Sequence, residues 1–176
     1  MKALALTRTS IYIALAVTLR YMKNTFTTIQ FINIPLIFTI LAGIHLGYIP
    51  GFIVGIFSYL ISDLLIFPGL WTVVDSFLAG IIGAMWGIMY RVKMSKVELF
   101  ILVFLSILLY DILSSSILYM LFGLSPFQAF TLGILGLFIP VYGGGMIGVG
   151  PLTEGISAFF LNLIVYELER RGIVYG

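Results

Sequence analysis

Four acidic residues lie inside stretches of the sequence that are otherwise apolar. They are Asp63, Asp75, Asp111 and Glu154. A carboxylate within a membrane-spanning segment is costly, and it normally faces the protein interior or a water-filled cavity. There it could accept hydrogen bonds from a ligand that brings donors or positive charge. We therefore take these four residues as the first candidates for a binding site.

Each carboxylate has polar or aromatic neighbours on the same face of its predicted helix. Residues one or two helical turns apart lie on one side of a helix, so they can line a cavity together. Four helices are thus expected to turn a polar stripe toward a common cavity. The alternative is that the carboxylates cap helices or pair with Arg20 and Lys23 for stability. The neighbours are Tyr59 for Asp63, Trp71 for Asp75, Ser114 and Ser115 for Asp111, and Ser157 and Asn162 for Glu154.

Composition indicates the class of protein that holds these residues. Of 176 residues, 61% are hydrophobic and only 9% are charged, against about 25% charged in an average soluble domain. So few charges cannot cover a soluble fold, which excludes a soluble enzyme, a nucleic-acid-binding protein and a disordered chain. The chain has no cysteine and one histidine, so no thiolate or histidine-cluster metal site is expected. We expect one integral membrane domain that covers residues 1–176.

Charges, prolines and glycines divide the sequence into six predicted helices. Two irregular outer loops are expected: a polar one at 24–33 after the first helix, and an apolar one at 122–150 after the fifth. Within the second loop, residues 127–141 are predicted to be re-entrant or interfacial, with a seventh span as the alternative. The expected fold is an all-α, compact bundle of six transmembrane helices, at about 7–23, 34–46, 49–66, 70–90, 97–121 and 150–169.

The lysines and arginines predict the orientation of this bundle. With six spans and the N-terminus inside, seven basic residues fall on the cytoplasmic side and two, Arg20 and Lys23, fall outside. This excess is the positive-inside pattern. Both termini are therefore expected in the cytoplasm, and the four carboxylates in the outer half of the membrane. The seven inner residues are Lys2, Arg8, Arg91, Lys93, Lys96, Arg170 and Arg171.

Small residues recur at helical spacing in two places. Glycines stand at every fourth position from Gly43 to Gly55, and this spacing lets helices approach closely. A shorter stripe in the first helix either packs inside the bundle or forms a docking face for another membrane subunit. Its members are Ser10, Ala14 and Thr18.

The two tryptophans lie near opposite ends of the predicted helix at 70–90. Trp86 is expected in the belt of aromatic residues at a membrane surface. Trp71 borders the predicted cavity and could stack on a planar ligand.

Motifs for catalysis are absent from the sequence. It contains no Gly-x-Ser-x-Gly, no His-Glu-x-x-His and no phosphate-binding loop. A single histidine also leaves little from which to build a nucleophile–base pair. We expect no enzymatic activity, no cofactor and no ATP hydrolysis by this chain, so any ATP-driven transport needs a partner.

Proline, glycine and aspartate follow a recognisable order between residues 7 and 92. The order is Pro35, then Ala42-Gly43, Gly47, Gly51 and Gly55, then Ser62-Asp63, then Pro68-Gly69 with Trp71, and finally the glycine-rich run from Gly80 to Gly87. This pattern resembles the substrate-binding S components of energy-coupling factor (ECF) vitamin transporters. Residues 97–170 match that family mainly in the number and length of helices.

The resemblance implies a six-helix bundle in the plasma membrane that binds a vitamin or related micronutrient from outside. The loop at 24–33, with Asn24 and Gln30, would act as a lid. A separate transmembrane coupling subunit and two ATPase subunits would supply the driving force. The stripe of Ser10, Ala14 and Thr18 stands where family members often carry alanines that meet the coupling subunit. The N-terminal histidine motif of metal-uptake relatives is absent here, which disfavours cobalt or nickel.

The predicted cavity carries more acidic than basic groups. This balance favours a ligand with donors or positive charge, such as a thiamine-like ring, a modified nucleobase or a corrinoid, over biotin or folate. Two other classes stay open: a structural scaffold of the cell-shape protein type, and a self-sufficient small carrier or channel. The candidate substrate-binding residues are Asn33, Asp63, Trp71, Asp75, Asp111, Ser115, Glu154 and Asn162.

Overall fold

The chain is described by a computed structural model that covers residues 3–90, 94–139, 141–143 and 146–173. Lys2, Arg91 and Lys93, which contribute to the predicted orientation, lie outside these residues. Within them the chain forms seven helices and three short strands. The helices are α1 (Ala3–Phe26), α2 (Ile34–Leu46), α3 (Tyr48–Ile66), α4 (Leu70–Met89), α5 (Lys96–Leu121), α6 (Pro126–Gly136) and α7 (Pro151–Arg170). The strands are β1 (Ile29–Gln30), β2 (Val141–Gly143) and β3 (Met146–Gly148).

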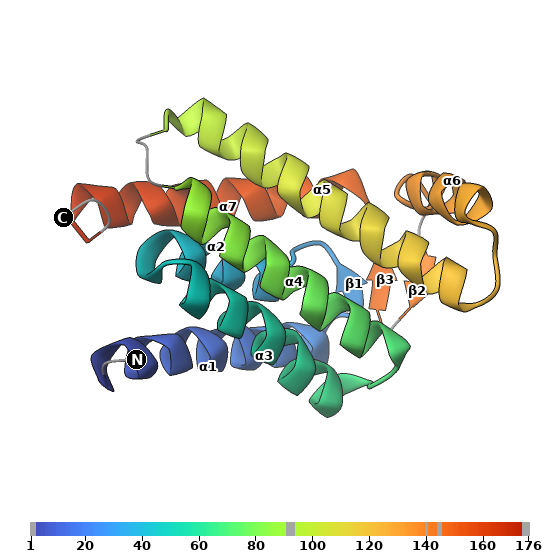
Figure 1. The fold of residues 1–176 in the computed structure, drawn as a ribbon, viewed down its shortest axis with the longest axis horizontal. Coiled ribbons are helices and arrows are strands. Elements are labelled where there is room, and N and C mark those ends of the chain that lie inside the picture. The colour runs from blue at the N-terminus through green and yellow to red at the C-terminus, as the bar shows by residue number, and fades with distance from the viewer. Residues whose placement is uncertain (1–2, 91–93, 140, 144–145, 174–176) are drawn as a thin grey trace.

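The long helices run side by side along the long axis of the molecule (Figure 1). Both ends of the chain lie at one end of this bundle, and the strands and α6 lie at the other. The six predicted helices begin and end within four residues of α1, α2, α3, α4, α5 and α7. The all-α prediction is therefore confirmed for the described residues.

Both loops that were expected to be irregular contain regular structure. The segment at 127–141 holds most of α6, whose 11 residues rise about 16 Å. That is about half the hydrocarbon thickness of a bilayer, so α6 is too short for a seventh span. The segment at 24–33 contains β1, which pairs in parallel with β3, while β2 pairs with β3 in antiparallel fashion. This pairing satisfies backbone N–H and C=O groups that an irregular loop would leave free.

Four helices are long and apolar enough to cross a membrane: α1, α3, α4 and α5. The 13 residues of α2 rise only about 20 Å, less than the thickness of the hydrocarbon core. The 20 residues of α7 are not among these four helices, and polar residues such as Glu154 and Asn162 interrupt its apolar stretch. The described fold is thus compatible with a multi-pass membrane protein.

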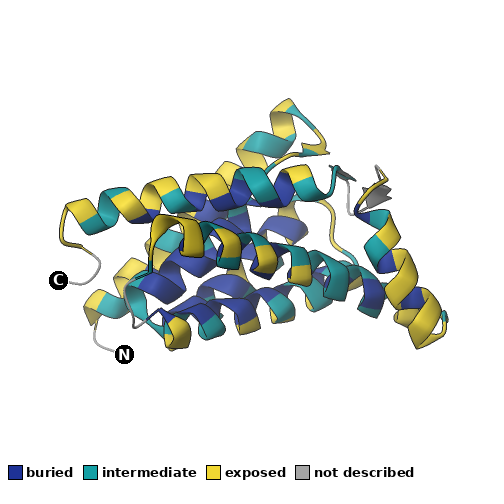
Figure 2. Cartoon of the chain, turned by 90° about the horizontal axis from the view of Figure 1, so that it is seen from above, coloured by how far each residue is buried: buried dark blue, intermediate teal, exposed yellow. Residues whose placement is uncertain are grey.

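The outer surface of the bundle is apolar and its interior holds many polar groups. Leu64, Val73 and Phe77 are exposed on α3 and α4, whereas Ser58 and Ser76 on the same helices are buried. Figure 2 shows this arrangement as exposed outer faces and buried inner faces along the helices. An apolar surface of this extent is unfavourable in water, and it suits contact with lipid.

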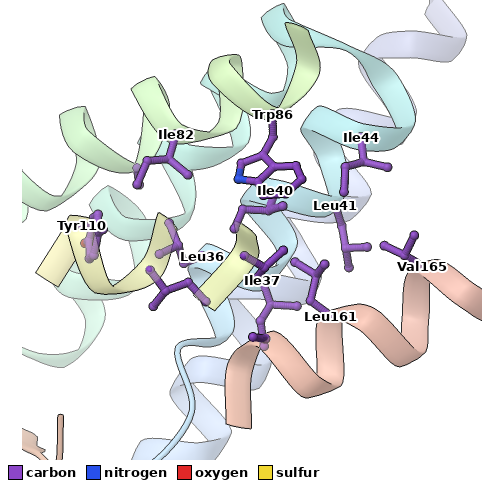
Figure 3. Packing of buried hydrophobic residues seen from close by; sticks show 14 of the residues in the cluster. Leu36, Ile37, Ile40, Leu41, Ile44, Ile82, Trp86, Tyr110, Leu161 and Val165 are labelled. Atoms are coloured by element: carbon purple, nitrogen blue, oxygen red, sulfur yellow. The ribbon is translucent and has the colours of Figure 1, made fainter. Parts of the chain in front are cut away.

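The core forms around α2, the shortest of the six predicted helices. Leu36, Ile40 and Leu41 of this helix are buried and pack against residues of α4, α5 and α7 (Figure 3). Trp86 of α4 belongs to the same cluster. It is 0% exposed, and its indole N–H donates to Ser106 Oγ at 3.1 Å. The prediction of a membrane-surface position for Trp86 is therefore wrong, because the indole faces the bundle.

Glycines bring α3 and α4 into backbone contact. A Cβ on Gly51 would overlap the carbonyl of Gly83, and a Cβ on Gly83 would overlap the carbonyl of Gly51. Gly47, between α2 and α3, has φ +97°, a conformation that L side chains rarely adopt. The glycine spacing thus serves helix packing, as expected.

Candidate binding cavity

A cavity of about 420 Å³ lies at the end of the bundle opposite the chain termini. Its wall is built from α1, α3, α4, α5, α6 and α7 together with the segments around β1 and β3. The polar residues of the wall are Arg20, Gln30, Asn33, Asp75, Asp111, Ser114, Ser115, Thr153 and Glu154. The aromatic residues of the wall are Tyr59, Trp71, Tyr110, Tyr119 and Phe122.

Most of the predicted site residues meet at this cavity. Six of the eight substrate-binding candidates line it, and so does the lid residue Gln30. Asp63, Asn162 and the lid residue Asn24 are not part of its wall. The six candidates at the wall are Asn33, Trp71, Asp75, Asp111, Ser115 and Glu154.

Asp63 is held in a buried ion pair instead of facing the cavity. Its Oδ1 lies 2.6 Å from Arg20 Nη1, and the two side chains are 2% and 7% exposed. The guanidinium of Arg20 also donates to Ser62 Oγ and lies 5.1 Å from the ring centroid of Tyr59. For Asp63 the structure therefore shows the stabilising pair that was the alternative to ligand binding. Arg20 reaches the cavity wall with its charge already balanced.

Asn162 lies too far along α7 to reach the cavity. It follows Glu154 by two helical turns, which is about 12 Å toward the end of the bundle that holds the termini. Its amide N–H donates to the backbone carbonyl of Lys96 at 2.7 Å, so it ties α7 to the first residue of α5.

Asp111 and Glu154 bring two carboxyl groups together across α5 and α7. Their side chains interact directly. Glu154 is 0% exposed, and apart from Asp111 its carboxyl oxygens have no hydrogen-bond partner among the described residues. Buried polar groups normally have such partners. Glu154 therefore brings unmet hydrogen-bonding capacity to the cavity wall.

Asp75 differs from this pair because a neighbour satisfies it. Its Oδ1 accepts a hydrogen bond from Ser114 Oγ, which joins α4 to α5. Tyr110 lies beside Asp75 and Tyr59, and the rings of Tyr110 and Tyr59 have centroids 5.6 Å apart. The α4–α5 side of the cavity thus combines a carboxylate with two tyrosines.

Asn33 fastens the start of α2 to its surroundings. Its Oδ1 accepts from Tyr59 Oη at 2.6 Å and from the Leu36 N–H at 3.3 Å, which caps α2. Its backbone N–H donates to Ser157 Oγ at 2.8 Å. Since the side-chain oxygen is engaged twice, Asn33 shapes the wall more than it offers a free acceptor.

The lid segment is tied down on both sides. Lys23 Nζ donates to Gln30 Oε1 at 3.1 Å and to the carbonyl of Ile29 at 3.2 Å. On the other side, Thr153 Oγ1 donates to the carbonyl of Gln30. These bonds place Gln30 at the cavity between α1 and α7.

Four of the polar and aromatic wall residues were not singled out from the sequence: Tyr110, Tyr119, Phe122 and Thr153. A signal existed for two of them. Tyr119 and Phe122 continue the stripe of Ser115 outward along α5 at helical spacing, whereas Tyr110 and Thr153 only stand next to predicted residues in the chain.

The predicted docking residues lie on the exposed face of α1. Ser10, Ala14 and Thr18 are exposed and border a shallow hollow together with Ile61 of α3. In the described bundle this stripe is therefore available to a partner or to lipid.

No protein-family model matches the chain, and neither a curated protein nor a solved structure matches it.

Proposed function

We propose that the chain is the high-affinity binding subunit for uptake of a vitamin or related small micronutrient, as in the S components of ECF transporters. It would lie in the plasma membrane and be energised by a separate transmembrane coupling subunit and two ATPase subunits. The observation that carries this proposal is the cavity with its buried carboxyl pair. Its volume of about 420 Å³ falls in the usual range of about 300–1,000 Å³ for small-molecule sites.

The topology of the proposal is six spans with both termini in the cytoplasm. Four helices qualify as spans by length and composition. We assign the remaining two to α2, extended by the segment before it, and to α7. The chain termini share one end of the bundle, which suits an even number of crossings. With the basic residues inside, the cavity opens on the outer half of the membrane.

The inner half of the bundle favours binding over conduction. Between the cavity and the termini, the interior is filled by Ile40, Leu41, Trp86 and Val103, which are at most 2% exposed. Such apolar packing favours an inner half that is closed to polar solutes. Release of a ligand to the inside would therefore require movement, and the exposed stripe of α1 is a surface through which a coupling subunit could impose it.

The cavity also distinguishes this proposal from a membrane scaffold. A scaffold has no need for carboxyl groups that converge on one cavity. Asp75, Asp111 and Glu154 come from three helices to one wall, and costly groups of this kind are typical of functional sites in membranes.

The test is purification without added ligand, followed by mass spectrometry of small molecules released on denaturation. We expect a vitamin-like compound in an amount close to that of the protein. Transport of that compound into liposomes should require the coupling subunit and the ATPases. Flux by the purified chain alone would support the carrier alternative, and the absence of any bound or binding small molecule would contradict the proposal.

A further inference from the structure

The carboxyl pair of Asp111 and Glu154 indicates the chemistry of the ligand. Apart from Asp111, the two buried oxygens of Glu154 have no partner among the described residues, and Asp111 beside it is partly exposed. Carboxylate oxygens only accept hydrogen bonds. A ligand that satisfies this pair must therefore present several N–H or O–H donors close together.

The charge balance of the wall favours donors that come with positive charge. Asp75, Asp111 and Glu154 are the acidic groups among the described wall residues, and Arg20 is the basic one. Arg20 is already paired with Asp63 at 2.6 Å. Two adjacent carboxyl groups that are both ionised repel each other strongly in a medium of low dielectric constant, so a bound cation favours this ionised state more than a neutral donor does.

The shape of the wall favours a flat molecule. The rings of Tyr59 and Tyr110 lie against each other at an interplanar angle of 39° on one side of the cavity, and Trp71 and Tyr119 also line it. Aromatic side chains bind planar rings by stacking, and they attract cations through the faces of their rings. The aromatic and acidic parts of the wall thus select for the same ligand.

We propose that the ligand is a planar cation with two adjacent N–H donors on one edge, of the amidinium or protonated aminopyrimidine type, which binds to the Asp111–Glu154 carboxyl pair. Two parallel N–H···O bonds give such an edge both strength and orientation. The inference rests on the proposed binding function and narrows its substrate class.

A metal ion is a weaker explanation of the pair. Calcium and magnesium need about six or more oxygen ligands. Among the described residues, no group of three or more histidine, cysteine, aspartate or glutamate side chains could hold a metal.

The test compares three molecules of nearly equal shape on the purified, ligand-free protein. Benzamidine carries the paired cationic donors, benzamide is neutral, and benzoate is an anion. We expect benzamidine to bind at least tenfold more tightly than benzamide, with benzoate weakest, when titrated by calorimetry or by NMR. Equal affinity of the three, tighter binding of benzoate, or no binding of benzamidine would overturn the inference.

Substitutions of Asp111 and Glu154 test whether benzamidine binds at the carboxyl pair. Glu154→Gln and Asp111→Asn keep the side-chain size, and each should weaken benzamidine binding by about 10–150-fold, the loss expected for charge-assisted hydrogen bonds. Glu167→Gln, at the far end of α7, should stay within twofold. A change below twofold in both cavity variants would also overturn the inference. If a variant fails to fold, the affinities of benzamidine, benzamide and benzoate for the unaltered protein still test the inference.

Different results would contradict the proposed ligand chemistry and the proposed binding function. A co-purified small molecule without paired cationic donors would overturn the inference and leave the binding function intact. A protein that neither releases a small molecule nor binds one would contradict both.

Discussion

Replacement of Arg20 by methionine should strongly destabilise the bundle. Arg20→Met removes the partner of Asp63, whose carboxylate is 2% exposed and lies 2.6 Å from the guanidinium. Loss of one partner from a buried ion pair leaves an uncompensated charge and costs about 3–5 kcal/mol. The same change also removes the hydrogen bond to Ser62 and the contact with the Tyr59 ring. We therefore expect the upper part of this range.

The assay is reversible unfolding in mixed detergent micelles, followed by circular dichroism and reported as the free energy of unfolding. The double variant Arg20→Met with Asp63→Asn removes the stranded charge, so it should regain at least half of the lost stability. Glu167→Gln is the matched control. Glu167 pairs with Arg170 and Arg171 at 2.8 Å, but these side chains are exposed, and the cost should stay below about 1 kcal/mol.

Two results would refute the reasoning about this ion pair. One is a loss of less than about 1 kcal/mol in Arg20→Met, which would mean that water or lipid headgroups reach Asp63. The other is a double variant that is no more stable than the single one, which would mean that the packing of Arg20 matters and its charge does not.

Three further predictions concern packing, partnering and topology. Gly83→Leu should cost about 3 kcal/mol or more in the same unfolding assay, because the new Cβ would overlap the Gly51 backbone. Gly155→Ala is the control and should not destabilise the protein, because a Cβ at this position would have no neighbour within 4 Å. Ala14→Trp should block co-purification with the coupling subunit and leave ligand binding unchanged, since Ala14 is exposed on α1; loss of both would place this stripe in a structural role. Ser95→Cys should react with thiol reagents only from the cytoplasmic side, and labelling from outside would contradict the six-span topology.

The course of the helices could be read from the sequence because apolar runs and their interruptions are local signals. The bounds of α2 were predicted at 34–46 and are Ile34–Leu46. Which side of an apolar helix faces protein was harder to infer. Trp86 lies near a helix end, and its position alone does not distinguish a lipid-facing side from a core-facing one, since both are apolar.

Residues could be assigned to the cavity wall from the sequence when their position on one helix face was sufficient. The assignment failed when a partner on another helix determined where the side chain lies. Asp111 and Ser115 could be placed at the cavity from spacing alone. Asp63 has a similar sequence context, yet Arg20 on another helix takes it out of the wall. The pairing of Ile29 with Ile147 could not be inferred either, because strands of two or three residues carry almost no periodic signal.

The small sheet links two regions of the chain that lie far apart in sequence. β1 follows α1 directly, while β3 leads into α7, which carries Glu154. Their backbone pairing is reinforced by the bond from Thr153 to the carbonyl of Gln30. A tilt of α1 against the rest of the bundle would therefore be transmitted to the first turn of α7 through these bonds. The sheet is thus a hydrogen-bonded connection between α1, whose exposed face carries Ser10, Ala14 and Thr18, and α7, which carries Glu154 at the cavity wall.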